Sequence, residues 1–170
     1  MKYLRHPAIL LLLCWMNTAA FAVESPLKPI DGQPLAPEFS LPGTNGRMYR
    51  LADYRGKPLI LNFWATWCPS CLAEMPSLQR AHDALARDGI PVIAINVGED
   101  AEMVVEFVQQ MPVQFPLPLD QNSAIARSYP LIGLPTTFVI DAEGRLVFSA
   151  TGTQVWDDPA LLAQIRALKQ

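Results

Sequence analysis

Cys68 and Cys71 are the residues best suited to carry chemistry, and only Pro69 and Ser70 lie between them. An apolar run typical of a buried strand precedes them, and apolar residues at helical spacing follow. At a helix start, unpaired backbone N–H groups and the helix dipole favour the thiolate of Cys68. We expect Cys68 to attack a substrate disulfide and Cys71 to resolve the mixed disulfide. The pair therefore predicts a thiol-disulfide oxidoreductase that needs no further cofactor.

Metal binding and haem attachment are the other uses of this cysteine spacing. The chain has no second cysteine pair that would complete a zinc site, because its third cysteine, Cys14, lies in the apolar N-terminal stretch. Haem attachment requires histidine directly after the second cysteine, and Leu72 stands there. We therefore expect no metal site.

Glu74 follows Cys71 by three residues, which is close to one helical turn. Its carboxylate is a candidate for proton exchange with Cys71 during resolution of a mixed disulfide. A glutamate in the first turn of a helix also stabilises the helix dipole without any catalytic role. The spacing alone leaves both roles open, that of a proton acceptor and that of a solvated acid.

Alternating strand and helix patterns around this motif predict an α/β domain with a mixed central sheet flanked by helices. Parallel strands joined by a helix are followed by an antiparallel hairpin, and a smaller hairpin opens the domain. We expect strands at residues 39–41, 47–51, 58–64, 91–97, 136–140 and 146–150. We expect helices after the cysteine motif, at 101–110, at 123–129 and after Pro159.

The N-terminus has the features of an export signal: basic Lys2 and Arg5, an apolar stretch, and an Ala-Phe-Ala site ending at Ala22. We expect residues 1–22 to be this signal, either cleaved or retained as a membrane anchor. Residues 23–35 are rich in proline and charge and predict a linker, and residues 36–170 form one domain. The formal net charge of −3 argues against a nucleic-acid partner.

The run Phe-Trp-Ala-Thr-Trp-Cys-Pro-Ser-Cys-Leu-Ala-Glu-Met-Pro at residues 63–76 resembles the thioredoxin superfamily, and specifically its exported TlpA/ResA/CcmG-like branch. The likeness extends from about residue 36 to the C-terminus and includes Gly-Leu-Pro-Thr-Thr at residues 133–137. It implies a thioredoxin-like fold with an N-terminal β-hairpin extension and one additional helix, which is the helix at residues 101–110.

The resemblance also assigns roles at the site. It implies that Pro135 follows a cis peptide bond and lies against the cysteine pair, with Leu134 and Thr136 flanking a groove for the substrate chain. Trp67 and Pro69 are expected to contribute to the same substrate-binding surface. Cytoplasmic thioredoxins carry a buried aspartate where this chain has Asn62, which cannot take up a proton there. The resemblance therefore implies that Glu74 handles the proton.

The function implied is that of a periplasmic, monomeric reductase of disulfides in client proteins, recharged by a thiol electron donor in the membrane. The branch includes proteins that act on apocytochrome c and proteins that serve copper-site assembly. Two alternatives stay open. One is a thiol oxidase, because the redox potential cannot be derived from the Cys-x-x-Cys motif alone. The other is a copper-binding chaperone on the same fold, although such relatives have a longer cysteine spacing and a downstream histidine.

Overall fold

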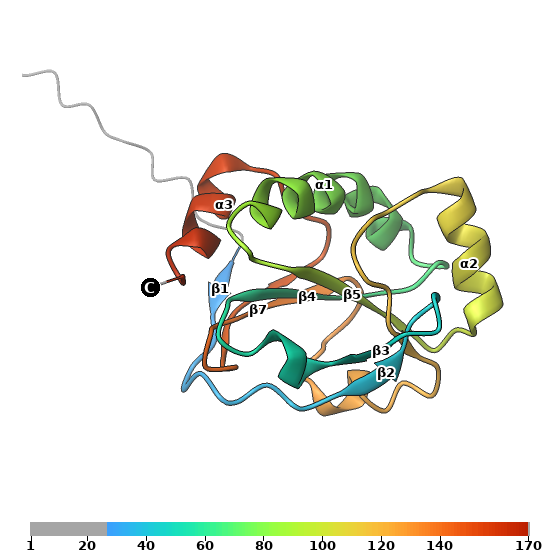
Figure 1. Ribbon diagram of the computed structural model, residues 1–170, viewed down its shortest axis with the longest axis horizontal. Coiled ribbons are helices and arrows are strands. Elements are labelled where there is room, and N and C mark those ends of the chain that lie inside the picture. Colours follow the sequence, from blue (N-terminus) through green and yellow to red (C-terminus); the bar gives the residue numbers. More distant parts are fainter. Residues whose placement is uncertain (1–26, 170) are drawn as a thin grey trace, which may run out of the picture.

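A six-stranded mixed sheet forms the centre of the computed structural model, which describes residues 27–169 (Figure 1). Its strand order is β1-β8-β7-β4-β5-β6, with β4, β5 and β6 parallel and the other pairs antiparallel. The strands are β1 (Lys28–Pro29), β4 (Leu59–Trp64), β5 (Val92–Val97), β6 (Leu119–Asp120), β7 (Thr136–Ile140) and β8 (Leu146–Thr151). The predicted mixed α/β sheet is confirmed.

Both faces of this sheet are covered, which explains the unbroken apolar character of its central strands. Helices α1 (Pro69–Ala86) and α3 (Pro159–Arg166) lie on one face (Figure 1). The other face carries the hairpin of β2 (Ser40–Pro42) and β3 (Met48–Arg50) and the 3-10 turns η1 (Leu51–Tyr54) and η2 (Ala126–Ser128). The predicted N-terminal hairpin is confirmed, and the helix predicted at residues 123–129 is reduced to a single 3-10 turn.

Strand β4 distributes its side chains alternately to the two faces, and this alternation places Asn62. Ile60 and Trp64 belong to the core beneath α1 and α3, whereas Leu61 and Phe63 belong to the opposite core. Asn62 is fully buried and has the same parity as Ile60 and Trp64. A polar side chain is thus set beneath the helix that carries Cys71.

The inserted helix α2 (Ala101–Gln110) matches its predicted bounds. Its N-cap is Asp100, whose carboxylate accepts a hydrogen bond from the Met103 N–H at 3.0 Å, as expected for a residue that satisfies an orphan donor of the first turn. Phe107 of α2 packs against Trp64 of β4, with ring centroids 4.8 Å apart. This contact fixes α2 beside the end of β4 from which the cysteine motif emerges.

The domain boundary predicted at residue 36 needs correction. Leu27 is 3% exposed and belongs to the core beneath α1 and α3. Lys28 and Pro29 pair with Ser149 and Phe148, and so extend the sheet at β8. This pairing uses main-chain groups and covers an otherwise open sheet edge, so side-chain periodicity gave no sign of it. The predicted export signal lies outside the described residues.

No helix within residues 27–169 combines the length and the apolar character needed to cross a membrane.

Candidate active site

The cysteine motif occupies the junction between β4 and α1, as its sequence context predicts. Cys68 is the N-cap of α1, and its sulfur accepts the backbone N–H of Cys71 at 3.2 Å. Pro69 fills the first helical position, where its missing N–H costs no hydrogen bond. A disulfide joins Cys68 and Cys71, whose Cα atoms are 5.3 Å apart. The structure therefore represents the oxidised state.

The two sulfurs differ in accessibility in the way that their expected roles require. Cys71 is completely buried beneath the first turn of α1, whereas Cys68 retains 4% of its surface exposed. Ser70 also lies within contact of the Cys68 sulfur, with its hydroxyl oxygen 3.4 Å away. The remaining exposed surface of the pair thus belongs to Cys68, in agreement with Cys68 as the attacking residue.

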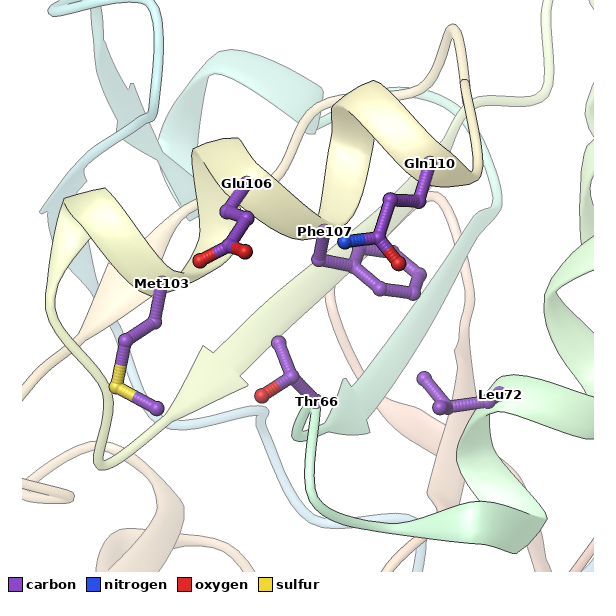
Figure 2. A pocket seen from close by; sticks show the side chains of 6 residues that line it. All are labelled: Thr66, Leu72, Met103, Glu106, Phe107 and Gln110. Carbon is purple, nitrogen blue, oxygen red and sulfur yellow. The ribbon is translucent and has the colours of Figure 1, made fainter.

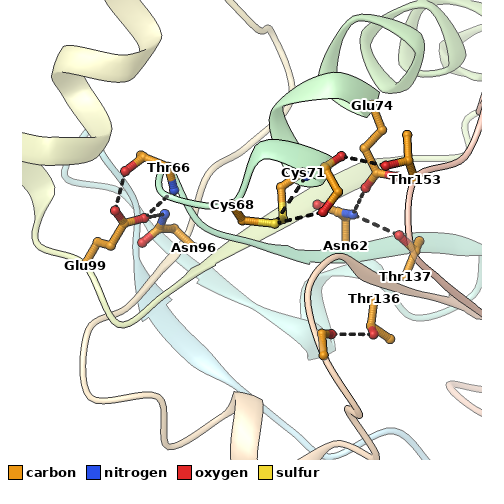
Figure 3. The surroundings of a disulfide bond; sticks show 12 residues. Asn62, Thr66, Cys68, Cys71, Glu74, Asn96, Glu99, Thr136, Thr137 and Thr153 are labelled. Carbon is orange, nitrogen blue, oxygen red and sulfur yellow. Dashed lines mark hydrogen bonds between the residues drawn. A yellow bond between two sulfur atoms is a disulfide. The ribbon is translucent and has the colours of Figure 1, made fainter.

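Glu74 is a buried carboxylate, so the alternative of a solvated helix-start acid is wrong. It is 1% exposed and lies on α1 one turn beyond Cys71 (Figure 3). Asn62 donates to one carboxylate oxygen at 2.9 Å. The backbone N–H of Gln154 and the indole N–H of Trp156 donate to the other, each at 3.1 Å. All the polar contacts of this buried carboxylate are donors.

These contacts act on the Glu74 pKa in opposite directions. Burial disfavours the charged form and is the larger effect, whereas the hydrogen bonds from Trp156, Gln154 and Asn62 favour it. The result is a pKa raised from 4.5 to about 7. A carboxyl with a pKa near neutrality exchanges protons readily in both directions at physiological pH. Glu74 is thus equipped to receive a thiol proton.

Asn62 links this carboxylate to the sheet. Its amide nitrogen also donates to the Thr137 hydroxyl on β7, at 2.9 Å, while its amide oxygen is buried without a hydrogen-bond partner among the described residues. The sequence identified Asn62 only as a residue unable to bind a proton. In the structure its amide N–H group, held by strand β4, donates to the Glu74 carboxylate and orients it from the side of the sheet.

Trp156 provides a direct test of how the Glu74 pKa is set. Replacing it with Phe keeps a buried aromatic ring but removes the indole N–H that favours the ionised carboxylate. A hydrogen bond to a charged group contributes about 1.5–3 kcal/mol, so we expect the Glu74 pKa to rise by about one to two pH units. Titration of the Glu74 carboxyl carbon by NMR in the oxidised protein measures this. A pKa that stayed at its wild-type value would show that the Trp156 hydrogen bond does not help to set it.

The loop before β7 brings Pro135 to the same end of the sheet. The Leu134–Pro135 peptide bond is cis, as the resemblance implied. Phe63 near the end of β4 is in register with Thr136 at the start of β7, so this loop and the cysteine motif emerge together. Leu134 is half-buried. The side chain of Thr136 is buried and donates to the Gly133 carbonyl, so only its backbone is placed to flank a substrate groove, and that role stays a prediction.

Exposed apolar side chains surround the motif. Trp67, directly before Cys68, is 66% exposed, and Pro69 is also exposed, in keeping with the predicted binding surface. Ile132 in the loop before Pro135 is 87% exposed, and the sequence analysis did not single it out. Large apolar groups in this setting are typical of a surface that docks another protein.

A second buried carboxylate, Glu99, anchors the turn that leads into Cys68. It follows the end of β5 and is 4% exposed. It accepts the Thr66 N–H at 2.7 Å, the Thr66 hydroxyl, and the Asn96 amide N–H at 2.6 Å. Figure 3 shows this group on one side of the disulfide and the Asn62–Glu74 group on the other. Sequence reasoning missed Glu99, because its partner Thr66 lies 33 residues away.

Known proteins resemble this chain over most of its length. A family model described as AhpC/TSA family matches residues 33–149. The thiol-disulfide oxidoreductase ResA of Geobacillus thermodenitrificans (strain NG80-2) is 39% identical over 123 residues, which cover 72% of this chain and 71% of that protein. The ResA protein of Bacillus subtilis (strain 168) is 36% identical over 152 residues, which cover 89% and 85%.

Solved structures agree with these relatives. The crystal structure of a thiol:disulfide interchange protein of the thioredoxin family from Chlorobium tepidum TLS matches with a TM-score of 0.70 at 27% identity, covering 82% of this chain and 97% of that chain. The thioredoxin-like fold and the family predicted from residues 63–76 are thereby confirmed. The chain therefore belongs to the AhpC/TSA family, and is a thioredoxin-like thiol-disulfide oxidoreductase of the ResA type.

Proposed function

We propose that this protein reduces disulfides in client proteins outside the cytoplasm, with Cys68 and Cys71 as its redox pair. The observation that carries the proposal is the buried Glu74 carboxylate, held one helical turn from Cys71 with a pKa of about 7. A resolving thiol that is shielded from water needs a nearby proton acceptor to become a nucleophile. Glu74 supplies that acceptor on the side away from solvent.

The cycle begins with the dithiol form. The Cys68 thiolate attacks one sulfur of the client disulfide, forms a mixed disulfide, and releases the other client sulfur as a thiolate that takes up a proton. Cys71 then transfers its proton to Glu74 and attacks the Cys68 sulfur. The Cys68–client bond breaks, and the second client thiolate leaves and takes up a proton from the solvent. The client gains two electrons and two protons, and the Cys68–Cys71 disulfide forms.

The oxidised state described here is the product of that cycle. A thiol donor in the membrane would return two electrons to the pair by the same exchange in reverse. Glu74 would then give its proton back to Cys71. A carboxyl with a pKa of about 7 serves both directions, because neither its protonated nor its ionised form is strongly disfavoured at neutral pH.

The clients that we propose are apocytochrome c, whose cysteines must stay reduced for haem attachment, or proteins of copper-site assembly. The export features of residues 1–22 support a periplasmic site of action. Whether those residues are cleaved or remain as an anchor determines only whether the domain diffuses or stays at the membrane. We propose that the domain acts as a monomer.

Replacing Cys71 with Ala tests the client-directed function. The variant retains the attacking sulfur of Cys68 and lacks the resolving one, so we expect client proteins to accumulate on Cys68 as mixed disulfides. Non-reducing gel electrophoresis followed by mass spectrometry identifies the trapped proteins. The Cys68→Ala variant is the matched control and should trap none. Failure of the Cys71→Ala variant to retain any client would contradict a client-directed reductase.

The direction of electron flow has its own test. Related Cys-x-x-Cys proteins have potentials from about −270 to about −120 mV, and reductases lie toward the negative end. We expect equilibration with a dithiothreitol or glutathione redox buffer to place this pair in that reducing range. A potential near −120 mV would instead identify a thiol oxidase.

A further inference from the structure

A pocket that the disulfide chemistry does not use lies beside the cysteine motif, between the start of α1 and helix α2 (Figure 2). Thr66 and Leu72, which flank the motif in sequence, form one wall. Residues of α2 face them across the opening in Figure 2. The side chains of α2 that line the pocket are Met103, Glu106, Phe107 and Gln110. Anything bound here would lie next to a protein attached to Cys68.

The pocket is large enough to hold one long side chain. Its volume of about 250 Å³ is smaller than that of most cofactor and metabolite sites, which span roughly 300–1,000 Å³. Leu72, Phe107 and Met103 give it an apolar lining. Phe107 is held against Trp64 with ring centroids 4.8 Å apart, and the turn carrying Thr66 is held by Glu99. Both walls are thus positioned before any partner arrives.

The charge at the rim selects the kind of side chain. Glu106 is exposed, and no lysine or arginine pairs with it among the described residues. Helix α2 also carries Glu102 one turn earlier and contains no basic residue. An acidic side chain would be repelled here, and a purely apolar one would gain no attraction from the Glu106 carboxylate, which stays hydrated at the exposed rim. A lysine or arginine fits both the apolar lining and the acidic rim, because its aliphatic stem packs on apolar surface while its charged end remains at the rim.

We propose that this pocket binds a lysine or arginine side chain of the client, close in sequence to the cysteine that Cys68 attacks. The proposal rests on the proposed function and specifies its substrate class as disulfides flanked by basic residues. Thr66 and Leu72 are near enough to Cys68 in sequence that a client residue next to the attacked cysteine falls beside the pocket. Glu106 is then a residue that determines specificity and takes no part in the sulfur chemistry.

Symmetric disulfide-linked peptide dimers test this directly. Their termini are blocked, and the residues on both sides of the cysteine are either Lys or Glu. The dithiol form of the full chain should reduce the Lys dimer with a single-turnover second-order rate constant about fivefold or more above that for the Glu dimer at low ionic strength. High salt should reduce this preference. Equal rates for the two dimers at low salt would overturn the proposal.

Charge-reversal variants show whether the preference arises at the pocket. Glu106→Lys should abolish or invert it. Glu143→Lys makes the same change in net charge in the turn between β7 and β8, at the opposite end of the sheet, and should retain it. Equal losses in the two variants would assign the preference to overall charge and contradict the pocket. If Glu106→Lys does not fold, the isosteric variant Glu106→Gln takes its place. It removes the charge and should lower the preference for the Lys dimer.

Two controls separate this proposal from the proposed function. Reduction of the neutral disulfide 2,2′-dithiodipyridine should be unchanged in Glu106→Lys, since that residue does not act on the sulfurs. If the wild-type dithiol reduces neither peptide dimer nor any protein disulfide, the reductase function itself fails. If it reduces both dimers equally, only the basic-side-chain pocket fails.

Discussion

Replacing Glu74 with Gln is expected to slow resolution of the mixed disulfide by about 10²–10⁴-fold near pH 8, the range that a positioned proton acceptor contributes. Glutamine keeps the size of the side chain but cannot accept a proton. The Cys71 thiol, completely buried in the oxidised state, would then have to lose its proton without an internal base. The attack by Cys68 does not use Glu74, so formation of the mixed disulfide should proceed at the wild-type rate.

Single-turnover kinetics with a peptide disulfide separate the two steps, and their pH profiles identify the role of Glu74. In the wild type the rate of the resolving step should fall as the pH drops through about 7, where Glu74 becomes protonated. In Glu74→Gln that inflection should disappear, and the rate should rise with hydroxide concentration. Glu143→Gln makes the same substitution at an exposed site and should behave as wild type. An unchanged profile in Glu74→Gln would assign Glu74 a structural role.

The parts of this site that could be predicted from sequence are those set by local patterns. The apolar run ending at Trp64, the cysteine pair and the helical spacing after it placed the motif at a strand-to-helix junction, and the structure agrees. Helix α2 and strand β7 occur at their predicted bounds. The hydrophobic pattern of each of these elements is visible within a short stretch of sequence, so no knowledge of long-range contacts was needed to predict it.

The surroundings of Glu74 could not be predicted, because its partners come from distant parts of the chain. Trp156 is 82 residues away from Glu74, and nothing in its sequence surroundings distinguishes it from an ordinary core aromatic residue. Spacing suggested that Glu74 approaches Cys71, but only the packing of α3 and the segment before it closes the carboxylate off from water. The same holds for Glu99 and for β1, whose contacts form through chain packing and main-chain pairing.

Asn62 combines a property that the sequence shows, its non-titrating amide, with contacts that only the structure shows. The alternation of side chains along β4 places it beneath α1, and its amide cannot titrate. A second carboxylate at this position would repel ionised Glu74 and raise the pKa of the pair further. The amide instead donates to Glu74 and to Thr137, so the site keeps one titrating group beside Cys71. Resolution of the mixed disulfide then depends on a single proton acceptor.

The burial of Glu74 should also make the stability of the oxidised protein depend on pH. Its folded pKa of about 7 lies above the ordinary value of 4.5, so between these values the folded state holds a proton that the unfolded state has lost. Stability from this group is therefore fully present below pH 4.5, is lost as the pH rises through about 7, and does not change further above that. The gap corresponds to about 3 kcal/mol in the free energy of unfolding.

Urea unfolding of wild type and Glu74→Gln, both oxidised, measures this effect as a difference between two curves. The other titrating groups are common to both proteins and cancel, so the wild type should lose about 3 kcal/mol relative to the variant between pH 4 and pH 8. A flat difference would mean that Glu74 has an ordinary pKa in the folded state. It would then be ionised throughout the neutral range and could not return a proton to Cys71. The carboxylate that limits stability at high pH is thus the same group that makes proton transfer reversible.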